Sequence, residues 1–430
     1  MDNRKNERGR GMSRPEQRII LHIDFDSFFA SVEQQCNPLF RDKPLGVTAT
    51  NGRSCIISSS REAKRLGIKT AMSTTDALRL CPTLNLIGSD FTKYWEVSKK
   101  FIAICNSFSP LIEVFSIDEL FMDITYCAHL FGGTEGLISK LKEQIKEEIG
   151  EYITVSVGVS HNKLLAKLGS GLKKPNGVMK ITPAQVESVY RVASLTDICG
   201  IGHRIHERLM AMGIYTLLQL RNTPMTKLIG EFGNVEGKFL FNVGQGIDTR
   251  PVVTYTQEPP IKSIGRQYCL PTNEHDQRVI LQNIYELFEE IGFKLRRLNK
   301  KTRSSGIWIA GAYNAHGHIT QGRYVDTGPE LFGLAMNVLK TKYGGLPVGY
   351  VRRIGVWAGY LEDSKNLSKP LFMKERKQEQ VIKIVDQLNE RFGDHTIRNG
   401  FLINAAKLTT VPNGFMADRF ERRKLANDPL

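Results

Sequence analysis

Two adjacent carboxylates interrupt an otherwise apolar stretch, EVFSIDELFMDIT, at residues 113–125. Such a stretch predicts a β-strand, in which neighbouring residues point to opposite faces of the sheet. One of Asp118 and Glu119 would then enter a core, where an uncompensated charge is costly. A turn or bulge at SIDE removes this conflict, because both side chains can then face one cavity.

A second apolar strand, IILHIDFDSFF, carries Asp24 near its end. If the two strands pair, three carboxylates come together, and they repel one another unless a cation or a proton compensates them. Oxygen donors suit Mg²⁺, and two such ions can hold the attacking and the leaving oxygen of a phosphoryl transfer. The alternative is that these acids are ordinary turn and cap residues, with Asp26 or Ser27 capping the helix after the strand.

The composition of the 430 residues favours a protein with cores of its own and a polyanionic partner. The chain is 41% hydrophobic, contains no apolar run of membrane-spanning length, and carries a net charge of +15. Its seven cysteines are scattered without a CxxC pair, which is typical of reduced thiols in a cytoplasmic protein. At this length we expect two to four domains.

Periodicity divides the chain into distinct parts. Residues 1–16 are a basic polar arm, and residues 17–182 alternate strands and helices. Residues 183–250 contain short helices broken by glycine, and residues 251–260 have the composition of an extended linker. Residues 261–362 follow the order βαββαβ, with strands expected at 262–270, 305–313, 318–325 and 351–361. The tail, residues 363–430, contains one charged helix.

Several short segments could bind phosphate groups. KKPNG places Lys174 on a tight turn, and REAKRLGI places Arg61 and Lys64 on one helical turn. DICGIGHRIHERLMAMGI places Gly200 and Gly202 between two helices, where backbone N–H groups are available to a phosphate. The run KLRRLNKKTR carries six cations and no acid. Each segment alone also fits an exposed turn or a solvated helix face.

Together these segments resemble the Y-family, lesion-bypass DNA polymerases, closest to their polymerase IV branch. The matching pieces are LHIDFDSFFASVEQ, SIDELFMDIT, SVGVSHNKLLAKL, KKPNG, DICGIGHRIHERLMAMGI and IKSIGRQYCLP, in the order of the family. The resemblance covers roughly residues 18–372. It implies an α+β multidomain right hand, with palm, fingers, helical thumb and a βαββαβ little-finger domain.

The resemblance implies a division of the chain. The palm comprises 17–36 and 91–182, the fingers 37–90, the thumb with its helix-hairpin-helix 183–250, and the little finger 261–362 after the linker 251–260. In the tail 363–430, the segment NLSKPLF is similar to a sliding-clamp peptide that lacks its usual glutamine, with Leu371 and Phe372 as its apolar pair.

The resemblance also implies roles for individual residues. Asp24, Asp118 and Glu119 would bind two Mg²⁺ with the backbone carbonyl of Phe25, and Phe29 would be the steric gate against ribonucleotides. Ser58, Arg61, Lys64 and Lys174 would bind the triphosphate. DNA would be bound by Gly200 and Gly202 and by the basic run, at Arg296, Arg297, Lys300 and Lys301. Arg61 stands where the family usually has tyrosine, and Leu120 where it usually has alanine.

The function expected from this resemblance is low-fidelity, template-directed DNA synthesis past lesions, with Mg²⁺, primer-template DNA and deoxynucleoside triphosphates. No second acidic cluster suggests a proofreading exonuclease. We expect a cytoplasmic monomer without a membrane segment. The alternatives are a DNA-binding relative that has lost catalysis, and another two-metal enzyme such as a nuclease or cyclase. The intact acids disfavour the former, because a scaffold gains nothing from clustered charge.

Overall fold

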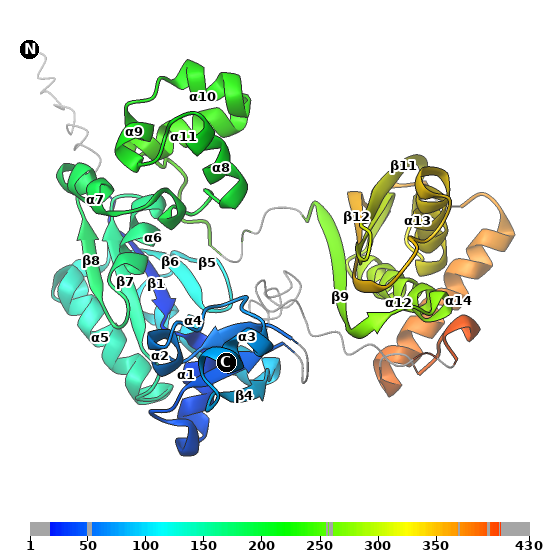
Figure 1. The fold of residues 1–430 in the computed structure, drawn as a ribbon, viewed down its shortest axis with the longest axis horizontal. Coiled ribbons are helices and arrows are strands. Elements are labelled where there is room, and N and C mark those ends of the chain that lie inside the picture. Colours follow the sequence, from blue (N-terminus) through cyan, green and yellow to red (C-terminus); the bar gives the residue numbers. More distant parts are fainter. Residues whose placement is uncertain are drawn as a thin grey trace, which may run out of the picture. The chain divides into compact units, whose positions relative to one another are not determined.

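The computed structural model describes residues 18–49, 54–254, 257, 261–368, 370–393, 396–403 and 405. They form two compact units, the first within residues 18–257 and the second beginning at residue 261 (Figure 1). No helix among these residues is long and apolar enough to cross a bilayer. The basic arm 1–16 lies outside the described residues.

A five-stranded sheet is the centre of the first unit, in the order β5-β6-β1-β7-β8. The strands are β1 (Ile20–Phe25), β5 (Ile112–Val114), β6 (Glu119–Asp123), β7 (Val155–Ser160) and β8 (Val178–Ile181). β1 is antiparallel to both β6 and β7. This central position places the end of β1 between the turn before β6 and the start of β7.

Helices cover both faces of this sheet. The helices are α4 (Phe91–Phe108), α5 (Gly133–Glu148) and α6 (Lys163–Leu172). Leu21 and Ile23 of β1 belong to the core that α4 and α5 form, whereas Ile20 packs with Ala166 of α6. Because side chains alternate along a strand, His22 and Asp24 share the α6 face with Ile20.

A smaller sheet, β3-β2-β4, carries the segment predicted as fingers. The helix α1 (Phe28–Cys36), within the segment predicted as palm, precedes it. The elements of the fingers segment are β2 (Leu45–Thr48), β3 (Ile56–Ser59), α2 (Arg61–Arg65), α3 (Thr74–Leu80) and β4 (Asn85–Gly88). Ile56, Ala63, Ile68 and Ala77 form its own small core. The helical turn predicted for REAKRLGI is α2.

Short helices follow, as predicted for residues 183–250. They are α7 (Val186–Val192), α8 (His203–Ala211), α9 (Leu217–Arg221), α10 (Met225–Phe232) and α11 (Asn234–Gln245). The start of the predicted linker is tied to the first unit. Glu113 accepts the N–H of Val253 at 2.9 Å and the ammonium of Lys163 at 2.7 Å, and Lys163 also donates to the carbonyl of Pro251.

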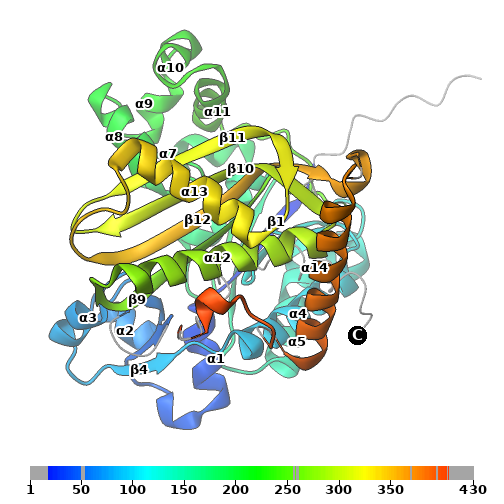
Figure 2. The ribbon, with the colours of Figure 1, turned by 90° about the vertical axis from the view of Figure 1, so that its right-hand side faces the viewer.

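The second unit contains the βαββαβ order that the sequence predicted. Its elements are β9 (Ser263–Glu274), α12 (Gln277–Arg297), β10 (Lys300–Gly311), β11 (Ala315–Val325), α13 (Gly328–Tyr343) and β12 (Val351–Asp363), with the sheet order β11-β10-β12-β9. α12 and α13 lie together on the sheet in Figure 2. β10 begins at Lys300, before the predicted 305, so the last four residues of the basic run lie in a strand.

The charged tail helix, α14 (Met373–Phe392), packs on this second unit. Beyond it, Phe401 contacts the ring of Tyr285 on α12, and Arg398 pairs with Glu286 of the same helix at 3.1 Å. Six short 3-10 helices complete the described elements: Pro38–Phe40, Ala128–Phe131, Pro183–Gln185, Leu195–Asp197, Ser364–Asn366 and Gly400–Leu402. The division between little finger and tail at residue 363 stays a prediction, but the described tail residues are part of the packed unit.

Candidate active site

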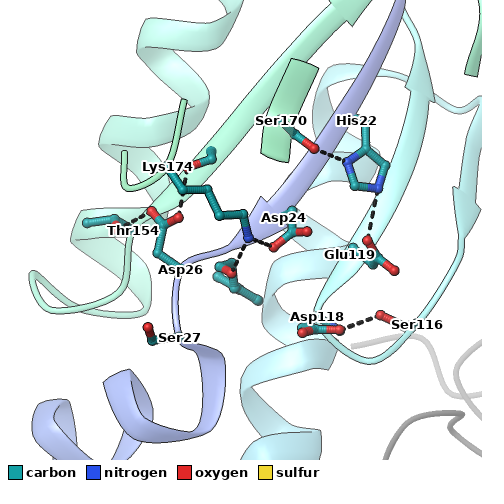
Figure 3. A network of polar contacts seen from close by, with 12 residues as sticks. His22, Asp24, Asp26, Ser27, Ser116, Asp118, Glu119, Thr154, Ser170 and Lys174 are labelled. Atoms are coloured by element: carbon teal, nitrogen blue, oxygen red, sulfur yellow. Dashed lines mark hydrogen bonds and ion pairs between the residues drawn. The ribbon is translucent and has the colours of Figure 1, made fainter. Parts of the chain in front are cut away.

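Strand pairing places the acids of the two apolar strands side by side. In the antiparallel register of β1 and β6, Asp24 lies opposite Glu119, and Asp118 immediately precedes β6. The N–H of Phe25 donates to the carbonyl oxygen of Asp118 at 3.0 Å, which fixes the end of β1 against this turn. The three carboxylates therefore lie near one another at the end of β1 (Figure 3).

A bend at residues 116–118 answers the question that the sequence raised. The N–H groups of Phe115 and Ser116 both donate to the carbonyl of Glu119 at 3.1 Å. The hydroxyl of Ser116 donates to the carboxylate of Asp118. Asp118 is thus outside the alternating part of β6, so neither acid is forced into the core behind the sheet.

Burial controls the protonation of these acids. It raises the pKa of Asp24 to about 7, although the ammonium of Lys174 opposes the shift. Burial also raises the pKa of Asp118, against the hydrogen bond from Ser116. Burial acts in the same direction on Glu119, but the hydrogen bond from His22 and the charge of Lys167 outweigh it and lower the pKa of Glu119 to about 2. Without added positive charge, the site resists holding three carboxylates ionised together.

His22 and Lys167 surround Glu119, and sequence analysis did not identify them. His22 is fully buried, with Nε2 3.1 Å from Glu119 Oε2 and Nδ1 2.7 Å from Ser170 Oγ. Burial lowers the pKa of His22 to about 4, so the ring is neutral at pH 7. Lys167 of α6 donates to the same Glu119 oxygen. The signal in the sequence was spacing, since His22 precedes Asp24 by two residues and shares its face of the strand.

Lys174 reaches the acids from the KKPNG loop after α6. Its ammonium donates to Asp24 and also to the backbone carbonyl of Phe25, the latter at 3.3 Å. One ammonium group thus contacts two of the predicted metal-binding groups, the Asp24 carboxylate and the Phe25 carbonyl. Figure 3 shows the Lys174 side chain extending from its loop between Asp26 and Asp24.

Asp26 does not have the predicted role of a helix cap. Its buried carboxylate accepts hydrogen bonds from Thr154 Oγ1, Ser156 Oγ and the N–H of Asn176, each at 2.7 Å. Ser27 occupies the N-cap position of α1 with a left-handed φ of 54°, and its side chain makes no capping bond. The N-cap position is thus one of the two predicted, without the capping bond, whereas Asp26 ties the end of β1 to β7 and to the loop that carries Lys174.

The predicted triphosphate-binding residues of the fingers lie near the start of α1. Lys64 Nζ donates to Ser27 Oγ at 2.8 Å, and burial lowers the pKa of Lys64. Arg61 donates to Thr154 Oγ1, and this hydroxyl in turn donates to the carboxylate of Asp26. Ser58 Oγ accepts a backbone N–H of α1 at 3.4 Å. These contacts connect the fingers to the palm around the acids.

Phe29 lies in the first turn of α1, and its side chain is only 5% exposed. Its ring stacks on Tyr94 with centroids 4.4 Å apart, and it meets Phe91 edge-on at 5.7 Å. This packing supports the alternative that Phe29 is a core aromatic. Its position five residues after Asp24 is what the gate role requires, and that role stays a prediction.

The donor atoms at this site fit a hard divalent cation. His22, Asp24 and Glu119 each offer one ligand atom, and these atoms lie within 4.8 Å of one another. Asp118 is not in that group, and its carboxylate accepts a hydrogen bond from Ser116. The ammonium groups of Lys174 and Lys167 donate to the carboxylates of Asp24 and Glu119, so these oxygens already interact with positive charge. Carboxylate and carbonyl oxygens are the ligands that Mg²⁺ prefers.

The predicted DNA-binding glycines lie in the turn before α8. Gly200 has a φ of +110°, and an added Cβ would lie 2.5 Å from the ring of Phe239, so this position requires glycine. Gly202 is the N-cap of α8 and has open space around its Cα. A second glycine turn at Gly233 joins α10 and α11. The glycine turn predicted at Gly200 and Gly202 is therefore present.

The four cations of the basic run that were predicted to bind DNA are held in ion pairs within the second unit. Their partners are Asp386 for Arg296 (2.6 Å), Glu390 for Arg297 (3.6 Å), Asp363 for Lys300 (2.9 Å) and Glu379 for Lys301 (2.7 Å). Three of these four acids lie on α14. The run is therefore not a solvated helix end, and its contacts with DNA stay a prediction.

The segment similar to a clamp peptide precedes α14. Leu371 and Phe372 are 80% and 68% exposed. Two large apolar side chains this exposed gain little from their own fold. They are accessible to a partner with an apolar pocket.

Comparisons with known proteins agree along the chain. Residues 23–171 match the impB/mucB/samB family, residues 196–248 match the DNA polymerase-iota thumb domain, and residues 261–371 match the impB/mucB/samB family C-terminal domain. A Y-family DNA polymerase chimera, Dbh-Dpo4(243-245)-Dbh, superposes with a TM-score of 0.67 at 28% identity, over 80% of this chain and 98% of its own.

The fold and these matches show that the chain belongs to the Y family of DNA polymerases. It is a DNA-directed DNA polymerase. Its similarity extends to proteins named DNA polymerase IV, from Acetivibrio thermocellus (31% identity, over 92% of this chain and 100% of the relative) and Pelotomaculum thermopropionicum (32%, over 93% and 97%). The predicted right-hand fold is confirmed.

Proposed function

We propose that this polymerase adds deoxynucleotides by two-metal phosphoryl transfer with Mg²⁺, at low fidelity and without a proofreading exonuclease, during synthesis past DNA lesions. The observation that carries the proposal is the pairing of Asp24 with Glu119 across β1 and β6, with Asp118 in the adjoining turn. Two Mg²⁺ ions bound there would neutralise charge on the attacking and leaving oxygens. Asp24, Asp118, Glu119 and the carbonyl of Phe25 would hold them.

The residues around the acids would hold the nucleotide. Lys174 now donates to Asp24, and a triphosphate offers its ammonium another anionic partner. Lys64 and Arg61 lie at the same edge, on the first turn of the short helix α2. A guanidinium can contact two phosphate oxygens at once, which tyrosine cannot do. We propose that Arg61 supplies this contact together with Ser58.

Primer-template DNA would be held chiefly by its backbone. The turn at Gly200 and Gly202 precedes α8, where backbone N–H groups can bind a phosphate without reading sequence. Arg296, Arg297, Lys300 and Lys301 would contact DNA only to the extent that their ion pairs with α14 and with Asp363 open. Leu371 and Phe372 would bind the sliding clamp through their exposed side chains. We propose a monomeric, cytoplasmic enzyme that uses the clamp as its link to replication.

Primer extension on undamaged and abasic templates tests the proposal. We expect Asp118→Asn and Glu119→Gln each to lower the rate of nucleotide addition about 100-fold or more, because transition-state charge loses its compensation. Binding of primer-template DNA should change little. Asp123→Asn is the matched control, since Asp123 ends the same strand β6 and lies beside Thr125 rather than in the site.

The proposal fails if either substitution leaves extension near the wild-type rate while Asp123→Asn behaves identically. The wild type should extend past the abasic site and insert mismatched nucleotides readily. It should not shorten a mismatched primer in the absence of nucleotides. Rapid shortening of the primer would show an exonuclease and contradict that part of the proposal.

A further inference from the structure

The charges of α14 are sorted between its two faces. The helix has four acidic residues, and each pairs with a cation of the second unit: Glu375 with Arg323 (3.4 Å), Glu379 with Lys301 (2.7 Å), Asp386 with Arg296 (2.6 Å) and Glu390 with Arg297 (3.6 Å). The helix therefore uses every acid that it has to bind its own unit. What remains on the rest of its surface is basic or neutral.

The opposite face of α14 carries an apolar seam. Lys377, Val381, Ile384, Leu388 and Arg391 follow one another at intervals of four, three, four and three residues, which is the spacing of a helix–helix contact. Val381 is 59% exposed and Ile384 is 56% exposed. We call these five residues the outer seam. Its centre is apolar and both of its ends are cationic.

The surroundings of the outer seam add only positive charge. Lys374 is exposed one turn before Lys377, whereas the exposed Lys383 lies one turn from Glu379 and Asp386, beside the acidic face. The fifth cation of the helix, Arg376, donates to the carbonyl of Pro370. An exposed apolar strip bordered by one sign of charge fits a partner with the opposite sign.

We propose that the outer seam of α14 binds an acidic amphipathic helix of a partner protein. The apolar centre excludes a purely electrostatic partner such as DNA as the best fit, because Val381 and Ile384 have no favourable contact with phosphate. A second copy of this chain fits poorly. Two seams paired in parallel place Lys377 against Lys377, and paired antiparallel they place Lys377 against Arg391, so like charges meet in both cases.

The test uses the full-length chain and a designed, fluorescein-labelled helix of about four heptads, with Ile and Leu at positions a and d and Glu at e and g. A second peptide with Lys at e and g is the charge control. Fluorescence anisotropy should show that the Glu peptide binds about ten-fold tighter, or more, than the Lys peptide. Equal binding of both peptides, or binding of neither, overturns the proposal.

Substitutions locate the binding face. Val381→Glu with Ile384→Glu should weaken binding of the Glu peptide about ten-fold or more, because the apolar centre is lost. Val348→Glu is the matched control, since Val348 is 80% exposed in a loop of the same unit, and it should have no effect. If thermal melting shows that the double variant is unfolded, Ile384→Ser replaces it. Unchanged binding by the folded variant contradicts the proposal.

A charge exchange separates the other possible occupants. Lys377→Glu with Arg391→Glu should reverse the preference, so that the Lys peptide binds more tightly. If this variant instead loses affinity for a labelled DNA duplex by as much as it loses affinity for the Glu peptide, the seam is a DNA-binding face and the proposal is wrong. A wild-type dimer in analytical ultracentrifugation that Ile384→Glu dissociates would assign the seam to a second copy and overturn it as well.

Discussion

Individual residues of the site were predictable where their chemistry stands out from their sequence context. Asp24, Asp118 and Glu119 are acids in apolar strands, and this contrast identified them. His22 and Lys167 were missed because a histidine in a strand and a lysine on a helix are ordinary in sequence. Their importance depends on the register that places His22 Nε2 3.1 Å from Glu119 and on α6 crossing that face of the sheet.

Asp24 should make the stability of the metal-free protein depend on pH. Its pKa is raised by burial from 3.8 to about 7, so its contribution to folding is fully present below pH 4 and is lost as the pH rises to about 7. Asp24→Asn removes this loss. We therefore expect the variant to gain stability relative to the wild type between pH 5 and 8, by up to roughly 4 kcal/mol, since each pKa unit corresponds to about 1.4 kcal/mol.

Urea denaturation in EDTA at several pH values measures this difference. Glu187→Gln is the control, because Glu187 is an exposed acid that forms an i,i+4 pair on α7. The free energy of unfolding of this control should differ from that of the wild type by the same amount across the pH range. If the free energy of unfolding of Asp24→Asn differed from that of the wild type by the same amount at every pH, Asp24 would be ionised in the metal-free fold.

Replacing Phe29 distinguishes its predicted role as a steric gate from a role as a core aromatic. If the ring excludes the 2′-hydroxyl, Phe29→Ala should raise ribonucleotide incorporation about 10- to 200-fold while deoxynucleotide addition survives. The stacking on Tyr94 also predicts a loss of stability of about 3–5 kcal/mol, since a buried aromatic is removed. Extension with each nucleotide type, below the melting temperature of the variant, separates the effects. A folded variant that still rejects ribonucleotides would rule out the gate.

At the scale of elements, local periodicity predicted most helices and strands, including the βαββαβ order. It could not predict which elements pair through charge. The basic run KLRRLNKKTR suggested a phosphate-binding surface, because its acidic partners on α14 lie 78 or more residues further along the chain. A count of local charge contains no information on such a distant partner. The same limit hid the role of Asp26, whose three donors come from β7 and the KKPNG loop.

The end of the described tail should be needed for the stability of the second unit. Glu286 is 1% exposed on α12, and its ion partner is Arg398 at 3.1 Å. Arg398→Ala leaves this carboxylate buried without compensation, so we expect a loss of about 3 kcal/mol or more. Replacing both residues, as Glu286→Gln with Arg398→Met, should recover much of the loss.

Thermal and urea unfolding of the three proteins check this expectation. The double replacement is the essential comparison, because it removes the charges together. A single Arg398→Ala variant as stable as the wild type would show that water compensates Glu286, and that the tail contact adds nothing to the unit.

At the scale of the whole molecule, the net charge of +15 agrees with a DNA-binding enzyme. Affinity for primer-template DNA should fall steeply with salt and depend little on sequence. Four free phosphate contacts would contribute a slope of roughly 3.6, at about 0.9 each, in a plot of log affinity against log salt. Because Arg296, Arg297, Lys300 and Lys301 are ion-paired, we expect glutamine at all four positions to change the slope by much less.

Anisotropy of a labelled primer-template duplex across a salt series measures the slopes. The complementary variant, Glu379→Gln with Asp386→Asn, releases two of the cations and should raise DNA affinity only if they reach the duplex. A slope change near 3.6 in the four-glutamine variant would establish the basic run as the principal DNA contact despite its partners.

The packing of α14 and of residues 396–402 on the second unit also has a consequence for the order in which the chain is made. The described residues of the first unit end at residue 257, so its sheets and helices can fold while synthesis continues, as early domains generally do. The second unit cannot pair Glu286 until Arg398 has left the ribosome. Chains cut short by a premature stop in the tail would therefore carry a finished palm and an unfinished little finger. We expect cellular proteases to remove such fragments before they occupy DNA.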